Sequence, residues 1–473
     1  MALVPLGAVI RQLAESDPDR DFITCAGRTH SRLQVERNSN RMARWLAANG
    51  VAFGDYVTIA LPNSIEFIEL SIACWKVGAT PQPLSYRLPQ AELDAILDLV
   101  KPALLITEVP SIPDSYSDEP LLPDAVSPSW KAPTSGGSTG RPKIIVDGRK
   151  GEIDPAADPV YKMPRNGIVG YPGPLYHNAP FNGSLRGLLV GNHVVLMERF
   201  DAEGVLALIE QYRISYLFLV PTMMRRIIVL PDEVKAKYDL STFTTVFSSA
   251  AGVPVWLKQA WIDWLGPEGV HELYSGTERI ATVEISGTEW LEHQGSVGRL
   301  TFGELRIVDP DTREPLPNGE IGLIEERSPQ AQRPTYRYLG AESNEREDGW
   351  DTLGDMGWID DDGWVYLSDR RTDMILRGGA NIYPAEVEGA LESHPAIESS
   401  AVIGLPDEDL GAKVHAIVHA TGPVTEQELL DHLSTLLVRY KLPQSFEFVD
   451  EPLRSDAGKV RRSELRDQRI ARS

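Results

Sequence analysis

An alternation of helix and strand patterns along most of the chain is the feature that most constrains its fold. Ser31 and Gln34 form a capping-box pattern, which predicts a helix that ends near Asn49. Residues 56–61 are an apolar run typical of a buried strand, and Ser64 then caps a helix that Gly78 ends. Strands separated by helices form right-handed crossovers, so this order predicts a mostly parallel sheet.

The same alternation continues beyond residue 100. Residues 110–133 interrupt it, and because they are rich in Pro, Ser and Asp we expect a surface connection there. The predicted strands are residues 103–107, 194–197, 216–220, 245–247 and 271–274, and the predicted helices are residues 201–212 and 254–264. This order again favours an α/β architecture.

Beyond residue 300 the pattern changes to antiparallel pairs and then to a small α+β unit. Strands are predicted at residues 304–308, 322–325 and 364–367, with turns between them. The last hundred residues predict a helix over 384–393, strands over 401–403 and 414–418, and a helix that Thr425 and Glu428 open. Leucines at helical spacing extend this last helix to just before Pro443, and we expect them in the core.

Composition excludes several classes of protein. The 473 residues include 46 Lys+Arg and 68 Asp+Glu, a net charge of −22, which argues against nucleic acid or an anionic membrane as the main partner. The two cysteines, Cys25 and Cys74, cannot form a disulfide framework, so we expect buried thiols in a reducing compartment. The start lacks the pattern of a secretion signal and no apolar run is long enough to span a bilayer, so a cytoplasmic protein is predicted.

A glycine-rich loop at residues 134–143 (TSGGSTGRPK) is the first candidate for chemistry. Its glycines let successive backbone N–H groups turn toward one point, its hydroxyls add donors, and Lys143 supplies a positive charge, so the loop can cradle a polyphosphate. It is not a Walker A loop, because Gly140 is followed by Arg-Pro-Lys, and it lacks the glycine spacing of a dinucleotide fold. A flexible Ser/Gly linker is the alternative.

Further polar segments are ambiguous one by one. Residues 274–278 (YSGTE) follow a predicted strand at the edge where open α/β sheets bind ligands, and they offer an aromatic ring for a base and a carboxylate for Mg²⁺. Residues 352–355 end in an acidic side chain, which could bind ribose hydroxyls or merely shape a turn. Residues 369–373 suit a charged linker, and residues 454–462, with a lysine after a glycine, suit a basic tail.

Taken together and in this order, the segments resemble the adenylate-forming superfamily, which includes acyl-CoA synthetases, coumarate-CoA ligases, firefly luciferase and peptide-synthetase adenylation domains. The resemblance runs from Gly54 and the Asn63-x-x-Glu66-Phe67 pattern to Lys459. It implies an α/β fold with a large N-terminal domain of mostly parallel sheets, helices and a small barrel-like antiparallel part (residues 1–371), followed by a small mobile α+β domain (residues 372–473).

The resemblance also implies a role for each matched residue. Thr277 would contact the α-phosphate of ATP, Glu278 would hold Mg²⁺, and Lys459 would be the catalytic lysine of the small domain. The other predicted nucleotide-binding residues are Ser138, Thr139, Gly140, Lys143, Ser249, Ala250, Ala251, Gly252, Tyr274, Asp355 and Arg370. The acyl pocket is expected at Tyr176, His177, Phe181 and Gly276, CoA at Gly378 and Gly379, and the hinge at Thr372.

The chemistry of the superfamily accounts for these residue types. A carboxylate attacks the α-phosphorus of ATP and pyrophosphate leaves, so the site must direct cations at the transferred group. Lys459, Lys143 and Mg²⁺ on Glu278 would meet that need. A thiol then attacks the mixed anhydride after the small domain has rotated. The expected cofactors are therefore ATP, Mg²⁺ and CoA, and the substrate is a small-molecule carboxylic acid.

Some positions depart from the superfamily pattern. Thr372 stands where the hinge residue is usually Asp or Lys, Ile144 where a glycine usually follows the loop lysine, and Gly252 where proline is common. Residues 144–145, 174–180 and 197–201 look similar to stretches in ligases for bile acids and steroid side chains, which favours a bulky alicyclic or fatty acid. Two alternatives stay open: transfer to the phosphopantetheine of a carrier protein instead of CoA, and a nucleotide-binding relative without catalysis.

Overall fold

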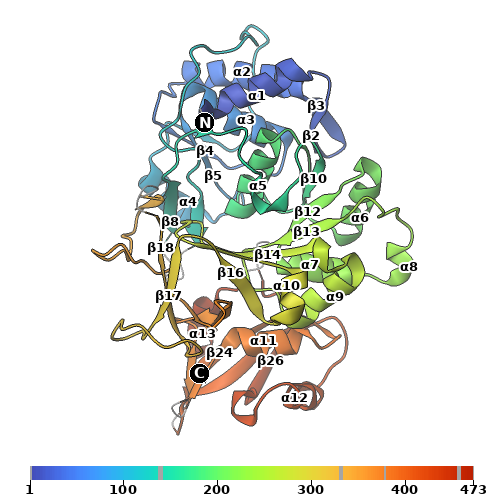
Figure 1. Ribbon diagram of the computed structural model, residues 1–473, viewed down its shortest axis with the longest axis vertical. Coiled ribbons are helices and arrows are strands. Elements are labelled where there is room, and N and C mark those ends of the chain that lie inside the picture. The colour runs from blue at the N-terminus through green and yellow to red at the C-terminus, as the bar shows by residue number, and fades with distance from the viewer. Residues whose placement is uncertain are drawn as a thin grey trace.

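The computed structural model describes residues 3–136, 142–329, 334–377, 380–407, 409–454 and 460–471. Figure 1 shows a large part, coloured blue to yellow, above a smaller C-terminal part in orange and red. Ile375 and residues beyond it form a hydrophobic cluster of their own, which includes Val387, Val402 and Leu429. This cluster supports a separate C-terminal unit, whose boundary at residue 372 stays a prediction.

One long sheet organises the large part. Among the described residues it has thirteen strands, and β2, β11, β10, β12, β13 and β14 are parallel neighbours. From edge to edge the strands are β17 (Glu304–Val308), β18 (Gly322–Arg327), β20 (Asp355–Ile359), β21 (Val365–Arg370), β16 (Ser296–Phe302), β15 (Thr282–Ser286), β14 (Val270–Tyr274), β13 (Thr245–Ser248), β12 (Tyr216–Leu219), β10 (Ile168–Tyr171), β11 (His193–Leu196), β2 (Asp21–Cys25) and β3 (Arg28–Ser31). The predicted strands between residues 194 and 274 and the predicted antiparallel strands between residues 304 and 367 thus belong to one continuous sheet, joined where β14 pairs antiparallel with β15. The predicted strands at residues 56–61 and 103–107 belong to a separate sheet.

Smaller sheets surround this one. They are β4 (Tyr56–Ile59) between β5 (Thr80–Pro83) and β6 (Leu104–Ile106); β8 (Pro142–Asp147) between β7 (Thr134–Gly136) and β19 (Tyr336–Leu339); β1 (Val4–Pro5) with β9 (Glu152–Ile153); β22 (Ile375–Arg377) with β23 (Ala380–Ile382); and β25 (Gly411–Ala420) between β24 (Ile397–Asp407) and β26 (Ser445–Val449). The β7–β8 hairpin flanks the predicted phosphate loop, of which residues 137–141 lie outside the described residues.

The helices begin and end largely where the capping patterns predict. They are α1 (Leu6–Ser16), α2 (Arg32–Ala48), α3 (Ile65–Val77), α4 (Gln90–Val100), α5 (Asn178–Leu189), α6 (Ala202–Tyr212), α7 (Pro221–Ile228), α8 (Asp232–Lys235), α9 (Val255–Leu265), α10 (Gly287–Glu292), α11 (Pro384–Glu392), α12 (Glu426–Ser434) and α13 (Arg462–Ile470). Ser31 and Gln34 form the full capping box of α2, and Gly78 ends α3 with a φ of 76°. None of the described helices has the length and apolarity needed to cross a bilayer.

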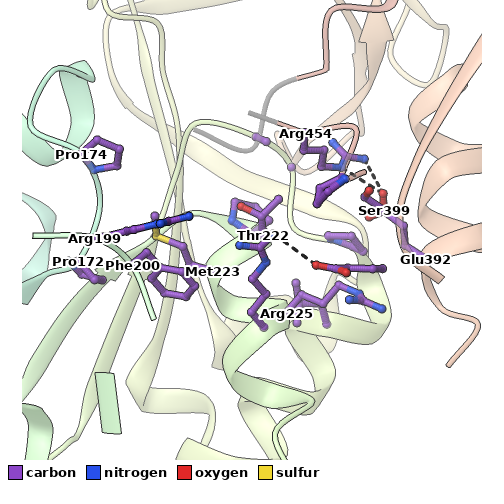
Figure 2. A pocket seen from close by; sticks show the side chains of 18 of the residues that line it. Pro172, Pro174, Arg199, Phe200, Thr222, Met223, Arg225, Glu392, Ser399 and Arg454 are labelled. Carbon is purple, nitrogen blue, oxygen red and sulfur yellow. Dashed lines mark hydrogen bonds and ion pairs between the residues drawn. The ribbon is translucent and has the colours of Figure 1, made fainter. Parts of the chain in front are cut away.

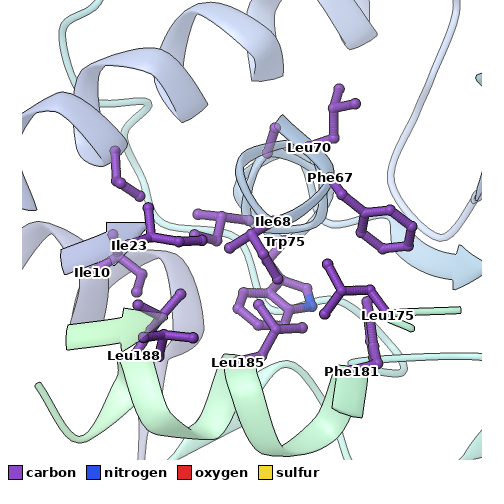
Figure 3. Packing of buried hydrophobic residues seen from close by; sticks show 14 of the residues in the cluster. Ile10, Ile23, Phe67, Ile68, Leu70, Trp75, Leu175, Phe181, Leu185 and Leu188 are labelled. Atoms are coloured by element: carbon purple, nitrogen blue, oxygen red, sulfur yellow. The ribbon is translucent and has the colours of Figure 1, made fainter. Parts of the chain in front are cut away.

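Helix α3 is the centre of the largest hydrophobic core. It is buried almost all round because its apolar residues do not keep to one face. Figure 3 shows Phe67, Ile68 and Trp75 of α3 above Leu185 and Leu188 of α5. Each such side chain contributes about 1.5–3 kcal/mol when it is fully buried. This packing fixes the start of α5, where the acyl pocket was predicted. The two cysteines are buried, as predicted.

Helix α12 is shorter than predicted. It ends at Ser434 instead of continuing to Pro443, and Leu436 and Tyr440 are 53% and 46% exposed. The hydroxyl groups of Ser434 and Thr435 donate to the backbone carbonyls three residues earlier, at 2.7 Å each. Such bonds compete with the helical pattern, and the leucines beyond this point have little core left to fill.

The segment over residues 110–133 is only partly a surface connection. Trp130 and Lys131 are buried, with 3% and 2% of their surface exposed. The backbone explains this burial, because Trp130 N donates to Arg149 O and Asp147 N donates to Lys131 O. The end of the segment therefore pairs with the chain around the end of β8, and the prediction is wrong for these residues.

Candidate active site

Lys143 lies at one end of a small polar cluster. It belongs to β8, and its Nζ donates to the Tyr338 hydroxyl at 2.8 Å and lies 3.4 Å from Glu278 Oε1. The Tyr338 hydroxyl donates in turn to the same Glu278 oxygen at 2.6 Å. Tyr338 comes from β19, which pairs with β8, so the sheet sets this geometry. The structure thus brings together the two predicted residues, Lys143 and Glu278, and adds Tyr338.

Tyr274 and the predicted ribose residues form a second group. Tyr274 is the last residue of β14, and its hydroxyl donates to Asp355 Oδ2 at 2.9 Å. Arg370 Nε lies 3.3 Å from Asp355 Oδ1, because the two residues face each other across β20 and β21. Burial, followed by the charges of Asp355 and Glu326, raises the pKa of Tyr274, so its hydroxyl stays protonated at neutral pH.

Glu326 links the two groups, and the sequence interpretation missed it. Its side chain is buried, 1% exposed, within electrostatic range of Asp355, Glu278 and Tyr274. Burial first, and then repulsion from Asp355, raise the pKa of Glu326 to about 8. A signal was present, because two consecutive glutamates in a strand pattern place one charge on each face of the sheet. Glu325 on the other face pairs with Arg306 at 2.6 Å.

The loop after β13 is braced by a buried ion pair. Lys258 Nζ lies 2.6 Å from Glu272 Oε2, and the other oxygen of Glu272 accepts from the Val253 amide at 3.1 Å. Because β13 and β14 are parallel neighbours, their ends bring Ser249 close to the strand that carries Tyr274. The predicted adenine-side residues therefore lie on a fixed loop, in which Ala250 has a φ of 78°.

Gly276 is needed at its position for steric reasons. A Cβ there would lie 2.3 Å from Leu353 Cδ1 and 2.9 Å from Glu278 Oε2, so any side chain would displace the carboxylate. Thr277 is half-buried in the turn that follows, where the Arg279 amide donates to the Gly276 carbonyl at 3.1 Å. This tight turn aims Glu278 toward Lys143.

A cavity of about 190 Å³ opens between the large and small parts of the chain. Three predicted site residues line this cavity: Tyr176 from the predicted acyl pocket, and Ala251 and Gly252 from the predicted adenine side. Figure 2 shows Arg199 and Arg225 extending from the large part, opposite Glu392 and Arg454 of the small part. Arg225 donates to the Ile397 carbonyl across this boundary. Lys143, Glu278 and Tyr274 do not line this cavity.

The remaining predicted site residues keep the status of predictions. His177 is the N-cap residue of α5 and its ring lies 4.7 Å from that of Tyr176, whereas Phe181 is fully buried against Phe67. Thr372 is exposed and donates to Asp373 at 3.3 Å. Six predicted residues lie outside the described part of the chain: Ser138, Thr139, Gly140, Gly378, Gly379 and Lys459.

Comparisons with known proteins decide the family. The model of the AMP-binding enzyme family matches residues 10–134 and 132–334, and the model of its C-terminal domain matches residues 386–459. The chain belongs to the AMP-binding enzyme family. This result confirms the resemblance to adenylate-forming enzymes that the motifs suggested.

Relatives of this AMP-binding enzyme match it over nearly its whole length. A feruloyl-CoA synthase from Amycolatopsis sp is 32% identical, with 98% of each chain covered. A fatty acid–[acyl-carrier-protein] ligase from Streptomyces coeruleorubidus is 29% identical over 96% of this chain and 94% of the relative. The structure of O-succinylbenzoate coenzyme A synthetase from Bacillus subtilis in complex with ATP and magnesium ion is 25% identical, has a TM-score of 0.81, and matches 98% of this chain and 100% of that one. These matches confirm the predicted α/β fold.

Proposed function

We propose that this AMP-binding enzyme activates a carboxylic acid with ATP, forming an acyl-adenylate and pyrophosphate, and then transfers the acyl group to the thiol of CoA. The proposal agrees with the CoA ligases among its relatives. The observation that carries it is the contact of Lys143 with Glu278 beside the Tyr274–Asp355–Arg370 group. A flexible linker, the alternative for the glycine loop, gives no reason for that arrangement.

Each side chain has a role in this reaction. Lys143 offers a positive charge to the phosphates of ATP, and Tyr274 presents its ring to the adenine. Asp355, whose carboxylate already accepts from Tyr274, can also accept from a ribose hydroxyl. Tyr338 holds the Lys143 ammonium and the Glu278 carboxylate in one orientation, which lowers the cost of assembling the site when ATP arrives.

The carboxylates of this site fit Mg²⁺. Glu326 lies within electrostatic range of both Asp355 and Glu278, with few cations among the described residues to balance the three carboxylates. No set of three or more potential ligand side chains converges on a metal position in the described part of the chain. Mg²⁺ usually takes one or two carboxylates together with substrate phosphates, so Glu278 alone would suffice as a protein ligand. Bound there, Mg²⁺ would neutralise phosphate charge.

The cavity between the two parts of the chain is the approach that we propose for the thiol. Its arginines, among them Arg199 and Arg225, suit the phosphates of CoA, and its floor includes Ala251 and Gly252. A carrier-protein phosphopantetheine is the alternative acceptor, which the carrier-protein ligase among the relatives favours. A location in the cytoplasm stays a prediction from the sequence.

Acid-dependent exchange of pyrophosphate into ATP tests the first step. We expect exchange with at least one acid from a panel of aromatic, alicyclic and fatty acids, and none without an acid. No exchange with any acid, while an active relative assayed in parallel exchanges, would instead indicate a nucleotide-binding protein without catalysis. Mass spectrometry of products formed with CoA and with carrier protein offered together then identifies the acceptor.

A further inference from the structure

A second charged cluster lies beside α5, and the proposed chemistry has not used it. Three cations surround the ring of the buried Trp130: Lys131 Nζ lies 5.2 Å, Arg149 Cζ 5.4 Å and Arg186 Cζ 5.1 Å from its centroid. Arg279, the residue after Glu278, lies within electrostatic range of Arg149 and Arg186. We call these four residues the cation cluster.

One carboxylate serves the whole cation cluster. Asp147 Oδ2 lies 3.2 Å from Lys131 Nζ and 2.6 Å from Arg149 Nη2. The charge of Asp147 also acts on Arg186 and Arg279, where it opposes the lowering of their pKa. Four cations and one carboxylate leave a formal excess of three positive charges. This excess stands out in a chain whose net charge is −22.

Arg186 and Arg279 are half-buried, and both lack the carboxylate partners that buried guanidinium groups usually have. Arg186 Nε donates to Asn182 Oδ1 at 2.9 Å, and within the described residues nothing accepts from its two terminal nitrogens. The Arg279 guanidinium lies 4.6 Å from the centroid of the Phe302 ring, and none of the described residues forms a hydrogen bond or an ion pair with its side chain. The Trp130 indole N–H is buried without an acceptor among the described residues. Arg186 and Arg279 therefore present donors and positive charge, and no carboxylate of the described residues pairs with either of them.

Packing alone does not account for these charges. The attraction of a cation to an aromatic ring is weaker than the cost of removing an ion from water. Burial first, and then repulsion from Arg149, lower the pKa of both Arg186 and Arg279, which shows that the environment disfavours their charged forms. A bound anion would offset this cost.

The position of the cluster indicates which ligand brings the anion. Arg186 lies on α5, the helix that follows His177 and carries Phe181, and Arg279 belongs to the loop that carries Gly276. Both elements are those of the predicted acyl pocket. Asn182 orients Arg186 and donates to the Tyr161 hydroxyl, and the Tyr161 ring packs against Phe218 and Phe247, with centroids 6.3 and 5.4 Å away. An aromatic wall beside a cation suits an acid with an apolar body and a charged end.

We propose that the acid activated by this enzyme carries a second negatively charged group, which Arg186 and Arg279 bind beside α5. The inference rests on the proposed function and names its substrate class: dicarboxylic acids, or acids with another anionic end, in preference to simple fatty acids. Arg186 and Arg279 are specificity-determining residues in this account, and Asn182 is a positioning residue.

The test uses matched acids. Pyrophosphate exchange is measured for dicarboxylic acids from succinate to dodecanedioate and for aromatic diacids, each beside its monomethyl ester and the monoacid of equal length. Because a charged hydrogen bond contributes about 1.5–3 kcal/mol, we expect the best diacid to exceed its ester in kcat/KM by about ten- to a hundredfold. Sulfonates of similar shape distinguish a specific carboxylate site from a general anion site.

Variants assign the preference to its residues. Arg186→Met should lower the ratio of diacid to ester at least about tenfold, chiefly by raising KM for the diacid, and Arg186→Lys should restore part of it. If circular dichroism shows that Arg186→Met does not fold, Arg279→Met replaces it and should lower the same ratio. Arg37→Met, at an arginine with 57% side-chain exposure on α2, is the matched control and should keep the ratio.

Three results would overturn the inference. The wild-type enzyme could use the monoacid and the ester as well as the diacid, which would refute the inference and leave the proposed function intact. Arg186→Met could raise KM for ATP and not for the acid, which would assign the cluster to the nucleotide phosphates. Failure of exchange with every acid would refute the proposed function itself, and the inference with it.

Discussion

Two regions on either side of the loop that carries Glu278 and Arg279 have opposite charge imbalances when every ionisable side chain is counted with its formal charge. The nucleotide region has Glu278, Glu326 and Asp355 with Lys143 and Arg370 as its cations. The cation cluster has Lys131, Arg149, Arg186 and Arg279 with Asp147 as its carboxylate. Glu278 and Arg279 are adjacent in one turn, and the charged groups around the first and around the second thus have opposite net charge.

The contrast shows how one fold prepares two different ligand sites. In the nucleotide region, burial and repulsion between acids raise the pKa of Glu326. In the cation cluster, burial alone would raise the pKa of Asp147, but the charges of Lys131 and Arg149 outweigh it and hold the pKa below its usual range. Each region lacks the charge that a ligand would bring: a metal cation with ATP in one, an anionic group of the acid in the other.

Asp147→Asn should produce the largest effect, because it removes the single carboxylate of the cation cluster. Lys131 and Arg149 would then be buried without a counter-charge, and we expect a loss of about 3–5 kcal/mol in the free energy of unfolding. Urea denaturation measures it. Asp239→Asn, at an exposed ion pair with Arg213, is the control and should change little. Equal effects of the two variants would mean that Asp147 does not balance the cluster.

Lys143→Met removes the cation that contacts Glu278. Because the positive charge is needed on the phosphates, we expect kcat for pyrophosphate exchange to fall by about 10²–10³-fold, or about 3–4 kcal/mol. Lys150→Met changes an exposed lysine just beyond the same hairpin and serves as the control. A rate for Lys143→Met close to that of the control would remove Lys143 from the site.

Glu326→Gln tests whether the nucleotide region has an excess of negative charge that raises the pKa of Glu326. The pKa of Glu326 is raised in the folded protein to about 8, so its contribution to stability is complete below the unfolded pKa near ~4.3 and is lost as the pH rises toward 8. Wild-type stability should therefore fall by about 1.4 kcal/mol per pH unit over that window relative to Glu326→Gln, which cannot titrate.

Urea denaturation of both proteins between about pH 5 and pH 8 measures this difference. Asp147→Asn is a control with the opposite pH dependence. The pKa of Asp147 is lowered in the folded protein, so its contribution to the free energy of unfolding is lost only at acidic pH. If the difference between wild type and Glu326→Gln did not change with pH, the carboxyl group of Glu326 would not hold a proton in the folded protein.

Tyr338→Phe should have the smallest effect. It removes the hydroxyl that accepts from Lys143 and donates to Glu278, and leaves the ring under the ammonium group, 4.0 Å from its centroid. One hydrogen-bonding hydroxyl is worth about 0.5–1.5 kcal/mol, so we expect a loss of a few-fold to tenfold in kcat/KM for ATP. Tyr336→Phe, on the same strand but bonded to Asp351, is the comparison. A loss as large as that of Lys143→Met would give Tyr338 a direct role.

Local signals in the sequence predicted much of the fold and part of the site. Capping residues such as Ser31 and Ser64 act within one turn, so their helices begin where predicted. The order of motifs identified Lys143, Glu278 and Tyr274, which the fold brings into two adjoining groups. The extent of α12 was missed because Leu436 and Tyr440, which the pattern places in the core, are exposed in the fold.

Residues whose function depends on distant partners could not be predicted. Tyr338 joins the site because β19 pairs with β8, a strand almost two hundred residues earlier in the chain. Trp130 and Lys131 lie in a segment whose composition indicates surface, and only the pairing with the end of β8 buries them. Arg186 belongs to no local motif, and only the fold places it over the Trp130 ring and within electrostatic range of Arg149.

The central claim, that the two regions serve two different substrates, is tested most directly by a crossed pair of Michaelis constants. KM for ATP and KM for the preferred acid are measured by pyrophosphate exchange in wild type, in Arg186→Met and in Lys143→Met with its residual activity. The account predicts that Arg186→Met raises KM for the acid at least about tenfold with KM for ATP unchanged. Lys143→Met, besides lowering kcat, should raise KM for ATP and leave KM for the acid unchanged. Both variants raising the same constant would contradict it.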